Sequence, residues 1–187
     1  MNVLIAPLYV VTGVLFLAGM AKLFTPYATA TALRTIGIPK PLLAARTLGL
    51  SEVVLCAIAV ISGNAVAWLI VAATYAAFTV FVLWALQSDA AIGSCGCFGQ
   101  EDTPPTPGHA AFNAAAAAIA ALAVFDPVAL SSLDGPVIEL LMLAILVATG
   151  VALSVAALTI LPRNAAIAAG TVVDQAQPFR MKSGPVT

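Results

Sequence analysis

Long apolar runs separated by short polar connections dominate the chain. A helix needs about 20 mostly apolar residues to cross the hydrocarbon core of a membrane. Segments of that kind, or nearly so, cover residues 3–23, 42–61, 65–86, 109–125 and 136–161. This pattern predicts an all-α integral membrane protein. We expect a bundle of about five transmembrane helices with a core four-helix arrangement.

The fourth run has the weakest signal, because it is short and rich in alanine. Small side chains let helix backbones approach closely, so we expect this helix to pack against its neighbours rather than face lipid. The connections contain helix breakers, among them three prolines at 104, 105 and 107. We predict a transmembrane domain over residues 1–162, followed by a short, polar, flexible cytoplasmic tail over residues 163–187.

The composition supports a membrane protein. Hydrophobic residues make up 62% of the chain and charged residues only 8%, whereas about a quarter of the residues of a soluble domain are charged. No basic stripe interleaved with aromatic residues is present, so nucleic-acid binding is excluded as a class. A secretory signal peptide needs a basic start, and no Lys or Arg precedes the first apolar run. We expect that run to be a retained transmembrane helix.

The basic residues predict an orientation in the membrane. With five spans, the first connection, the 88–108 loop and the C-terminal tail fall on the same side. All seven Lys and Arg residues lie on or near that side: Lys22, Arg34, Lys40, Arg46, Arg163, Arg180 and Lys182. Because cytoplasmic loops carry an excess of Lys and Arg, we expect a multi-pass protein of the cell membrane with its N-terminus outside. The C-terminus and the 88–108 loop would then be cytoplasmic.

The sequence Cys95-Gly96-Cys97 in that loop is the leading candidate for chemistry. Three cysteines are too few for a disulfide scaffold. Two cysteines that flank a permissive glycine can reach disulfide distance, and the small ring would be strained. Strained disulfides exchange readily, which favours electron transfer over a scaffolding role. The alternatives are a loop without a special role and half of a metal site.

His109 is the only histidine, and with Asn113 it occupies one face at the start of the fourth run. As a base near neutral pH it could activate a Cys97 thiolate. It could also be a third metal ligand beside Cys95 and Cys97, but a closed zinc site needs a fourth ligand, which only an acidic residue of the loop could supply. The other interpretation is a polar side chain that reaches the membrane surface.

Glu52 and Cys56 lie inside the second run. A carboxylate at the centre of a bilayer costs on the order of 3 kcal/mol unless it is paired or protonated. The candidate partners of Glu52 are Arg46 and Lys22, and the pair would be either functional or a polar clamp between the first two spans. Cys56 is either a small buried hydrophobe or a third thiol that relays electrons across the bilayer.

Several of these residues together resemble the MauE family of methylamine-utilisation proteins, which is grouped with DoxX-like membrane proteins. The resemblance covers roughly residues 5–160. It is carried by "SCGCFGQ" with a following "HAAFN", by "LAGMAKLF" with Gly19 and Lys22, and by "LGLSEVVLCAI" with Glu52. The chain departs from the family at the fourth span, where a basic residue is expected shortly before the asparagine.

The resemblance implies a role in maturing the disulfide-rich small subunit of a methylamine dehydrogenase. It also implies a thioredoxin-like partner and a secreted or periplasmic client. The chain would then be a possible thiol-disulfide oxidoreductase that works through Cys95 and Cys97, and we expect no cofactor. Two alternatives stay open: a membrane assembly scaffold without enzymatic activity, and a small-solute transporter that uses Glu52 as a proton site.

A membrane-impermeant thiol reagent tests the orientation and the redox state of Cys95 and Cys97 together. If the loop is cytoplasmic, the reagent labels the pair only from the cytoplasmic side, and reductant increases the labelling of a pair that is oxidised. Labelling from the outer side alone would contradict the orientation.

Overall fold

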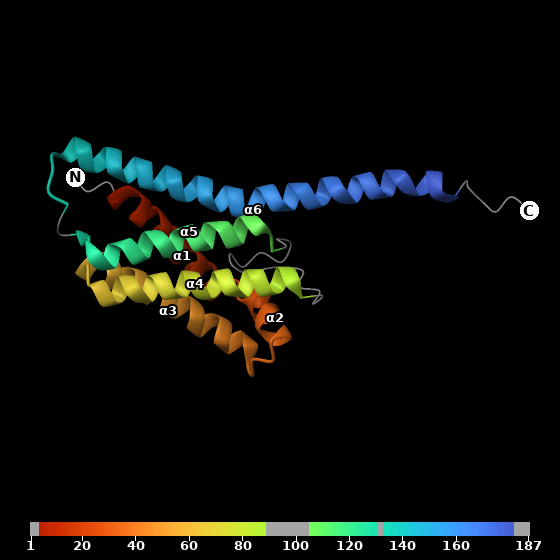
Figure 1. Ribbon diagram of the computed structural model, residues 1–187, viewed down its shortest axis with the longest axis horizontal. Helices are drawn as coiled ribbons and strands as arrows, with labels where there is room; N and C mark the ends of the chain where they lie inside the picture. The colour runs from red at the N-terminus through yellow and green to blue at the C-terminus, as the bar shows by residue number, and fades with distance from the viewer. Residues whose placement is uncertain (1–3, 89–104, 131–132, 182–187) are drawn as a thin grey trace, which may run out of the picture.

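The computed structural model describes residues 4–88, 105–130 and 133–181, and every regular element in these ranges is helical. Figure 1 shows the helices as a bundle with one long helix along its outside. They are α1 (Ile5–Phe24), α2 (Tyr27–Thr35), α3 (Pro41–Ser62), α4 (Ala65–Gln87), α5 (Pro107–Phe125) and α6 (Val137–Met181).

Five of these helices are long and apolar enough to cross a membrane: α1, α3, α4, α5 and the first part of α6, Val137–Leu161. Their bounds differ by only a few residues from the runs expected from the sequence. The alanine-rich fourth run is a helix of 19 residues. The predicted all-α membrane fold is therefore confirmed.

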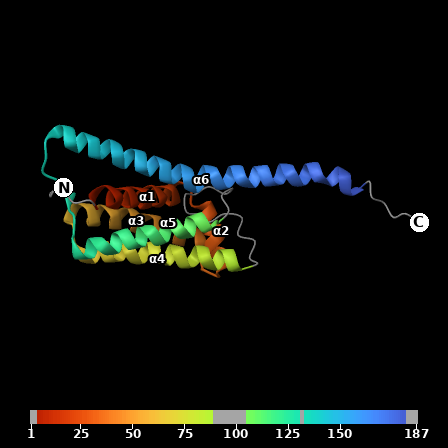
Figure 2. The ribbon, with the colours of Figure 1, turned by 45° about the horizontal axis from the view of Figure 1, so that its top comes forward.

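The core is a four-helix arrangement of α1, α3, α4 and α5, as predicted. The most extensive packing joins α4 to α5 and α1 to α3, while α6 contacts mainly α1. In two views related by a 45° turn, α6 lies along the outside of the bundle (Figures 1 and 2). Few residues in the transmembrane part of α6 are buried, so one of its sides packs on the bundle and the rest would face lipid.

The helix ends follow from local sequence. Pro41 and Pro107 occupy the first positions of α3 and α5, where proline's missing N–H removes no helical hydrogen bond. α3 ends at Gly63, which has a φ of 60° that suits glycine. Asn64 then caps α4, because its side chain accepts a hydrogen bond of 2.7 Å from the backbone N–H of Val66. The turn between α3 and α4 is therefore short and well specified.

The structure adds two helical segments that the sequence pattern did not predict. The connection before α3 contains α2, whose small side chains Ala28, Thr29, Ala30 and Ala32 are buried, with α3 as its main neighbour. The flexible tail expected from residue 163 is helical as far as Met181. Alanine favours helix strongly, and the "NAAIAAG" stretch that follows Arg163 supplies that propensity. Figure 1 shows this part of α6 projecting beyond the bundle.

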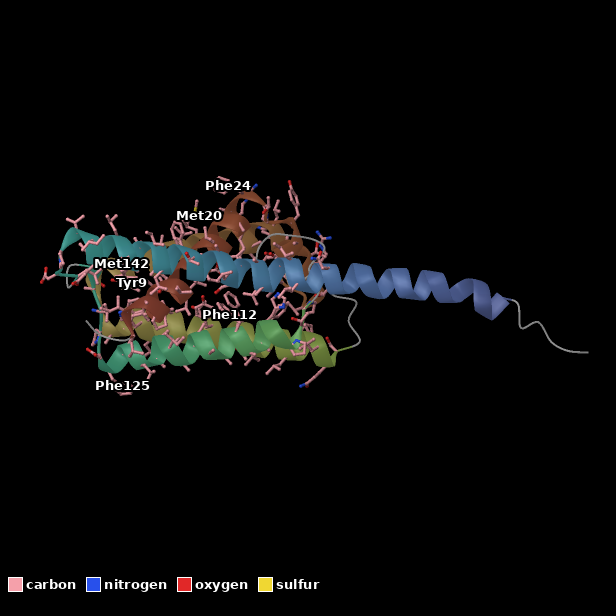
Figure 3. All side chains as sticks on the ribbon, turned by 90° about the horizontal axis from the view of Figure 1, so that it is seen from above. Tyr9, Met20, Phe24, Phe112, Phe125 and Met142 are labelled. Carbon is pink, nitrogen blue, oxygen red and sulfur yellow. The ribbon has the colours of Figure 1, made fainter. Side chains whose placement is uncertain are left out.

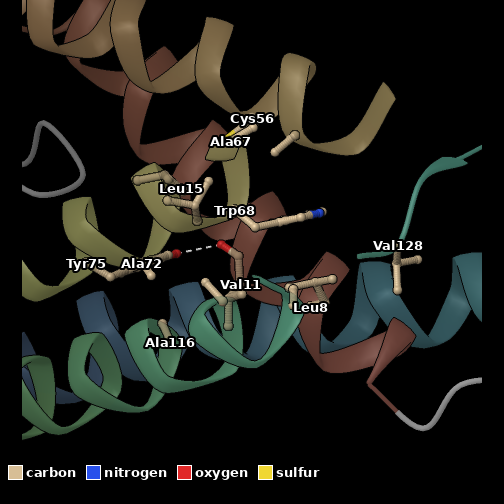
Figure 4. Close-up of a cluster of buried hydrophobic side chains, with 14 of the residues drawn as sticks. Leu8, Val11, Leu15, Cys56, Ala67, Trp68, Ala72, Tyr75, Ala116 and Val128 are labelled. Atoms are coloured by element: carbon tan, nitrogen blue, oxygen red, sulfur yellow. Dashed lines mark hydrogen bonds between the residues drawn. The ribbon is translucent and has the colours of Figure 1, made fainter. Parts of the chain in front are cut away.

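The interior of the bundle is built around two large side chains of α4, Trp68 and Tyr75, which are fully buried. The Tyr75 hydroxyl donates a hydrogen bond to the backbone carbonyl of Val11 in α1 (Figure 4). On α5, Ala116 and Ala120 are also buried. Because these positions are alanines, α5 can approach α4 closely, as expected for the fourth run.

Large apolar side chains cover the outside of the helices. Phe24, Phe125 and Met142 are well exposed, and Figure 3 shows them at the periphery of the bundle. A soluble protein rarely exposes so much contiguous apolar surface. This surface is what a protein surrounded by lipid requires.

Gly19 and Gly49 mark the closest approach of α1 and α3. A Cβ atom at Gly49 would lie 2.6 Å from the Gly19 carbonyl oxygen, and one at Gly19 would lie 2.8 Å from the Gly49 carbonyl oxygen. Both distances are shorter than van der Waals contact, and the two carbonyl oxygens that would clash belong to the backbone. The two helices can therefore cross at this distance only because both positions lack a side chain.

Replacement of Gly49 by alanine should destabilise the protein by about 1–3 kcal/mol, the range for overpacking a well-packed interior. Thermal unfolding of the purified protein in detergent measures the effect. Gly108→Ala is the matched control, because a Cβ there meets its nearest neighbour at 3.4 Å. Equal stability of the two variants would contradict the close crossing.

Candidate functional site

A buried ion pair joins α1 to α3. The Lys22 ammonium donates a hydrogen bond of 2.9 Å to Oε2 of Glu52, and the two side chains are 3% and 1% exposed. Lys22 Nζ also lies 3.4 Å from the Ala18 carbonyl oxygen. Of the two partners that the sequence offered for Glu52, the structure selects Lys22, while Arg46 lies exposed on α3.

The position of this pair follows from the Gly19–Gly49 crossing. Lys22 is three residues after Gly19, and Glu52 is three residues after Gly49. A Cβ added to Gly49 would lie 2.8 Å from Cβ of Lys22, and one added to Gly19 would lie 3.0 Å from Cβ of Glu52. Each charged residue therefore lies against the glycine of the other helix, and the close crossing brings the two side chains within reach of each other. The Phe78 ring of α4 lies 5.3 Å from Lys22 Nζ, within the range of a cation–π contact.

His109 lies in the first turn of α5 and is only 2% exposed. Its Nδ1 shares a hydrogen bond of 2.8 Å with the Thr106 hydroxyl, just before the helix begins. Thr106 thus fixes the orientation of the ring. Asn113 lies one turn further along α5 and is also buried, so the expected common face of His109 and Asn113 is the face turned into the bundle.

Lys22, His109 and Asn113 line one cavity of about 20 Å³. Its remaining walls are apolar or aromatic and come from α1, α4, α5 and α6. They are Val14, Leu15, Ala18, Tyr75, Phe78, Phe112 and Leu158. We call this space, together with Glu52 behind Lys22, the polar centre. Four of the residues singled out from the sequence therefore meet at one place: Lys22, Glu52, His109 and Asn113.

The polar centre lies towards one end of the bundle. α4 ends at Gln87 and α5 begins at Pro107 at this end (Figure 1), so the chain between them starts and returns there. Cys95 and Cys97 belong to residues 89–104, outside the described residues. Their disulfide and their proposed pairing with His109 stay predictions, and so does the alternative metal site. Within the described ranges, no three His, Cys, Asp or Glu residues form a group that could hold a metal.

Cys56 lies one helical turn from Glu52 on α3, but it does not line the cavity of the polar centre. Its thiol is buried and lies 3.5 Å from the Thr12 carbonyl oxygen. Cys56 instead lines a larger apolar cavity of about 710 Å³ between α1, α3 and α6, together with Tyr9 and Leu143. Figure 4 shows Cys56 at the edge of the apolar core. Its surroundings match the small-hydrophobe interpretation, and the electron-relay role stays a prediction.

Thr106 and Phe78 were not singled out from the sequence. Thr106 stands three residues before His109 and directly before a proline that starts the helix, which is a pattern typical of a helix N-cap. The sequence therefore contained a signal that could have identified Thr106. Phe78 gave no signal of its own, because its contact with Lys22 depends on how α4 packs against α1.

Comparison with known proteins identifies a family. The family model described as methylamine utilisation protein MauE matches residues 1–126, which include α1 to α5, the polar centre and both cysteines of the 89–104 segment. α6 lies beyond the match, so the match ends earlier than the resemblance expected from the sequence. No curated protein and no solved structure matches the chain.

Removal of one member of the ion pair should destabilise the protein more than removal of both. Lys22→Met leaves the Glu52 carboxylate buried without its partner, a change that typically costs 3–5 kcal/mol. Lys22→Met/Glu52→Met should recover a large part of that loss, and Arg46→Met should change stability by less than about 0.5 kcal/mol. Unfolding in detergent measures these three variants and the single variant Glu52→Met. If the loss of unfolding free energy in the double variant equals the sum of the losses in the two single variants, the pairing is contradicted.

Proposed function

Because the chain belongs to the MauE family, we propose that it is a membrane protein of thiol-redox type that assists the maturation of a secreted or periplasmic client. The client class is a disulfide-rich protein, such as the small subunit of a methylamine dehydrogenase. The proposed reactive groups are the thiols of Cys95 and Cys97. A thioredoxin-like protein is the proposed exchange partner.

One observation carries the proposal: the polar centre lies towards the end of the bundle where α4 ends and α5 begins, and residues 89–104 connect these two helices in sequence. Buried ionisable residues within a membrane are costly and commonly mark functional sites. Here they lie on three different helices, towards the end of the bundle where α4 ends and α5 begins. The residues between α4 and α5 include the only two neighbouring cysteines of the sequence. Cys97 is 12 residues from His109 (109 − 97), close enough in sequence for the loop to reach the polar centre.

The proposed chemistry needs a proton acceptor and a pair of thiols. The thiolate is the nucleophile in disulfide exchange, so a Cys97 thiol must first lose its proton, and His109 would accept it. The Cys97 sulfur then attacks a disulfide of the partner and forms a mixed disulfide, from which one partner thiol leaves. Cys95 attacks next, so a Cys95–Cys97 disulfide forms and the partner disulfide becomes two thiols. The same steps in reverse would oxidise the partner.

The proposed orientation places this exchange at the cytoplasmic face of the cell membrane, where reduced thioredoxin-like proteins are available. Lys22, Arg34, Lys40 and Arg46 belong to the helix ends on the same side of the bundle as the end of α4 (Figure 1). This grouping supports the inward orientation of that end, by the excess of basic residues in cytoplasmic segments. Disulfides of the client form on the other side, so electrons would have to cross the bilayer, and Cys56 is the candidate relay.

A second candidate is an assembly factor without redox chemistry. The observation that favours it is the ion pair itself, because a Lys22–Glu52 clamp between α1 and α3 stabilises the bundle whether or not a thiol reacts nearby. In that case the cysteines would shape their loop or hold a metal. Metal content of the purified protein distinguishes the metal-binding form.

Cys95→Ser/Cys97→Ser should abolish maturation of the client and change its disulfide content, while the membrane protein is still produced at a normal level. The measurement is the free-thiol content of the secreted client in cells that carry each variant. Cys56→Ser is measured in parallel: loss of maturation would support Cys56 as the relay, and intact maturation would exclude that role. Unchanged client disulfides with the double variant would rule out the redox function, and a partner that still co-purifies with it would favour the assembly factor.

A further inference from the structure

The cavity of the polar centre has the size of a single water molecule. Its volume is about 20 Å³, and a cavity needs roughly 10–15 Å³ of such space to hold one water. A purely apolar cavity of this size would stay dry. This one is lined by an ammonium, an imidazole and a carboxamide, from Lys22, His109 and Asn113.

Three polar side chains give a water molecule enough partners. Buried waters make about three hydrogen bonds, usually to polar groups that the protein leaves without another partner. Asn113 is 7% exposed and lines the cavity, and its carboxamide can both donate and accept a hydrogen bond there. A water in the cavity therefore has polar partners from three side chains, which is the number of hydrogen bonds that a buried water usually makes.

We propose that this cavity binds one water molecule between Lys22, His109 and Asn113, and that the water completes a proton path between His109 and Glu52. The path has four members: the imidazole, the water, the Lys22 ammonium and the Glu52 carboxylate. Its last step is the Lys22–Glu52 hydrogen bond of 2.9 Å. Thr106 holds the ring of His109 at the other end.

The proton moves by a chain of short transfers. Lys22 gives a proton to Oε2 of Glu52 and becomes a neutral amine. The water gives a proton to that amine and takes one from the His109 imidazolium. The net change is one proton moved from His109 to Glu52, with Lys22 and the water restored.

The polar, ionisable and aromatic groups in and near the path lie on four helices. Lys22 lies on α1, Cys56 lies one turn from Glu52 on α3, Tyr75 and Phe78 lie on α4, and His109 and Asn113 lie on α5. Among the described residues around the path, Lys22 and Glu52 are the charged pair, and His109 is the group that ordinarily titrates near neutral pH. The path is independent of thiol exchange, so it can be tested in protein that lacks Cys95 and Cys97.

Hydroxyl-radical footprinting with X-rays detects the water in the full-length protein. Radiation splits a bound water, and the radical oxidises the side chains next to it. Tyr75 lines the cavity, whereas Trp68 lies seven residues earlier on α4, is equally buried and lines neither cavity. We expect rapid oxidation of Tyr75 and protection of Trp68, and Asn113→Leu should lower the oxidation of Tyr75 to the level of Trp68. Equal protection of Tyr75 and Trp68 in the unmodified protein would overturn the water site.

Time-resolved infrared spectroscopy after a rapid drop in pH tests the proton path. Protonated Glu52 gives a carboxylic acid band that is absent from Glu52→Gln. We expect this band to form ~100-fold more slowly in His109→Phe and in Asn113→Leu, the scale of a lost general acid–base contribution. A band that forms at the unmodified rate in both variants, or that never forms in the unmodified protein, would overturn the path. Neither outcome bears on the client or on Cys95 and Cys97.

Discussion

The ion pair between Lys22 and Glu52 is the interaction on which the rest of the structure depends. Two charges inside a membrane are tolerated only when they neutralise each other, so α1 and α3 must be held at one distance and one register. The glycines at 19 and 49 make that distance possible. Once α1 and α3 are fixed, the other helices must fit around a charged centre as well as around an apolar core.

The transmembrane helices could be predicted from the sequence because the bilayer imposes a simple rule on length and polarity. The same rule identified Glu52, since a carboxylate in the second span needs a partner, and Lys22 was one of two cations within reach. α2 was missed because its buried residues are three alanines and one threonine, which give little apolar contrast. Pro162 suggested the end of a helix, but the alanine-rich stretch beyond it continues α6.

The meeting of Lys22 with His109 could not be predicted in the same way. They are 87 residues apart (109 − 22), and their common cavity depends on how α1, α4 and α5 pack together. The spacing alone places Asn113 on the same helix face as His109. The spacing does not show that this face points into the bundle. The sequence pattern identifies the polar residues. Their common cavity arises only when the helices pack together.

α6 changes the number of candidate membrane spans from four, an even number, to five, an odd number. The part of the chain that matches the family contains four crossing helices, so it would begin and end on the same side of the membrane. α6 is a fifth helix long enough to cross, and it runs back towards the end of the bundle where α4 ends, with its last turns projecting past the bundle (Figure 1). A protein with four crossings could carry its C-terminus only on the opposite face. The fifth helix therefore delivers the C-terminal segment to the face where the polar centre lies.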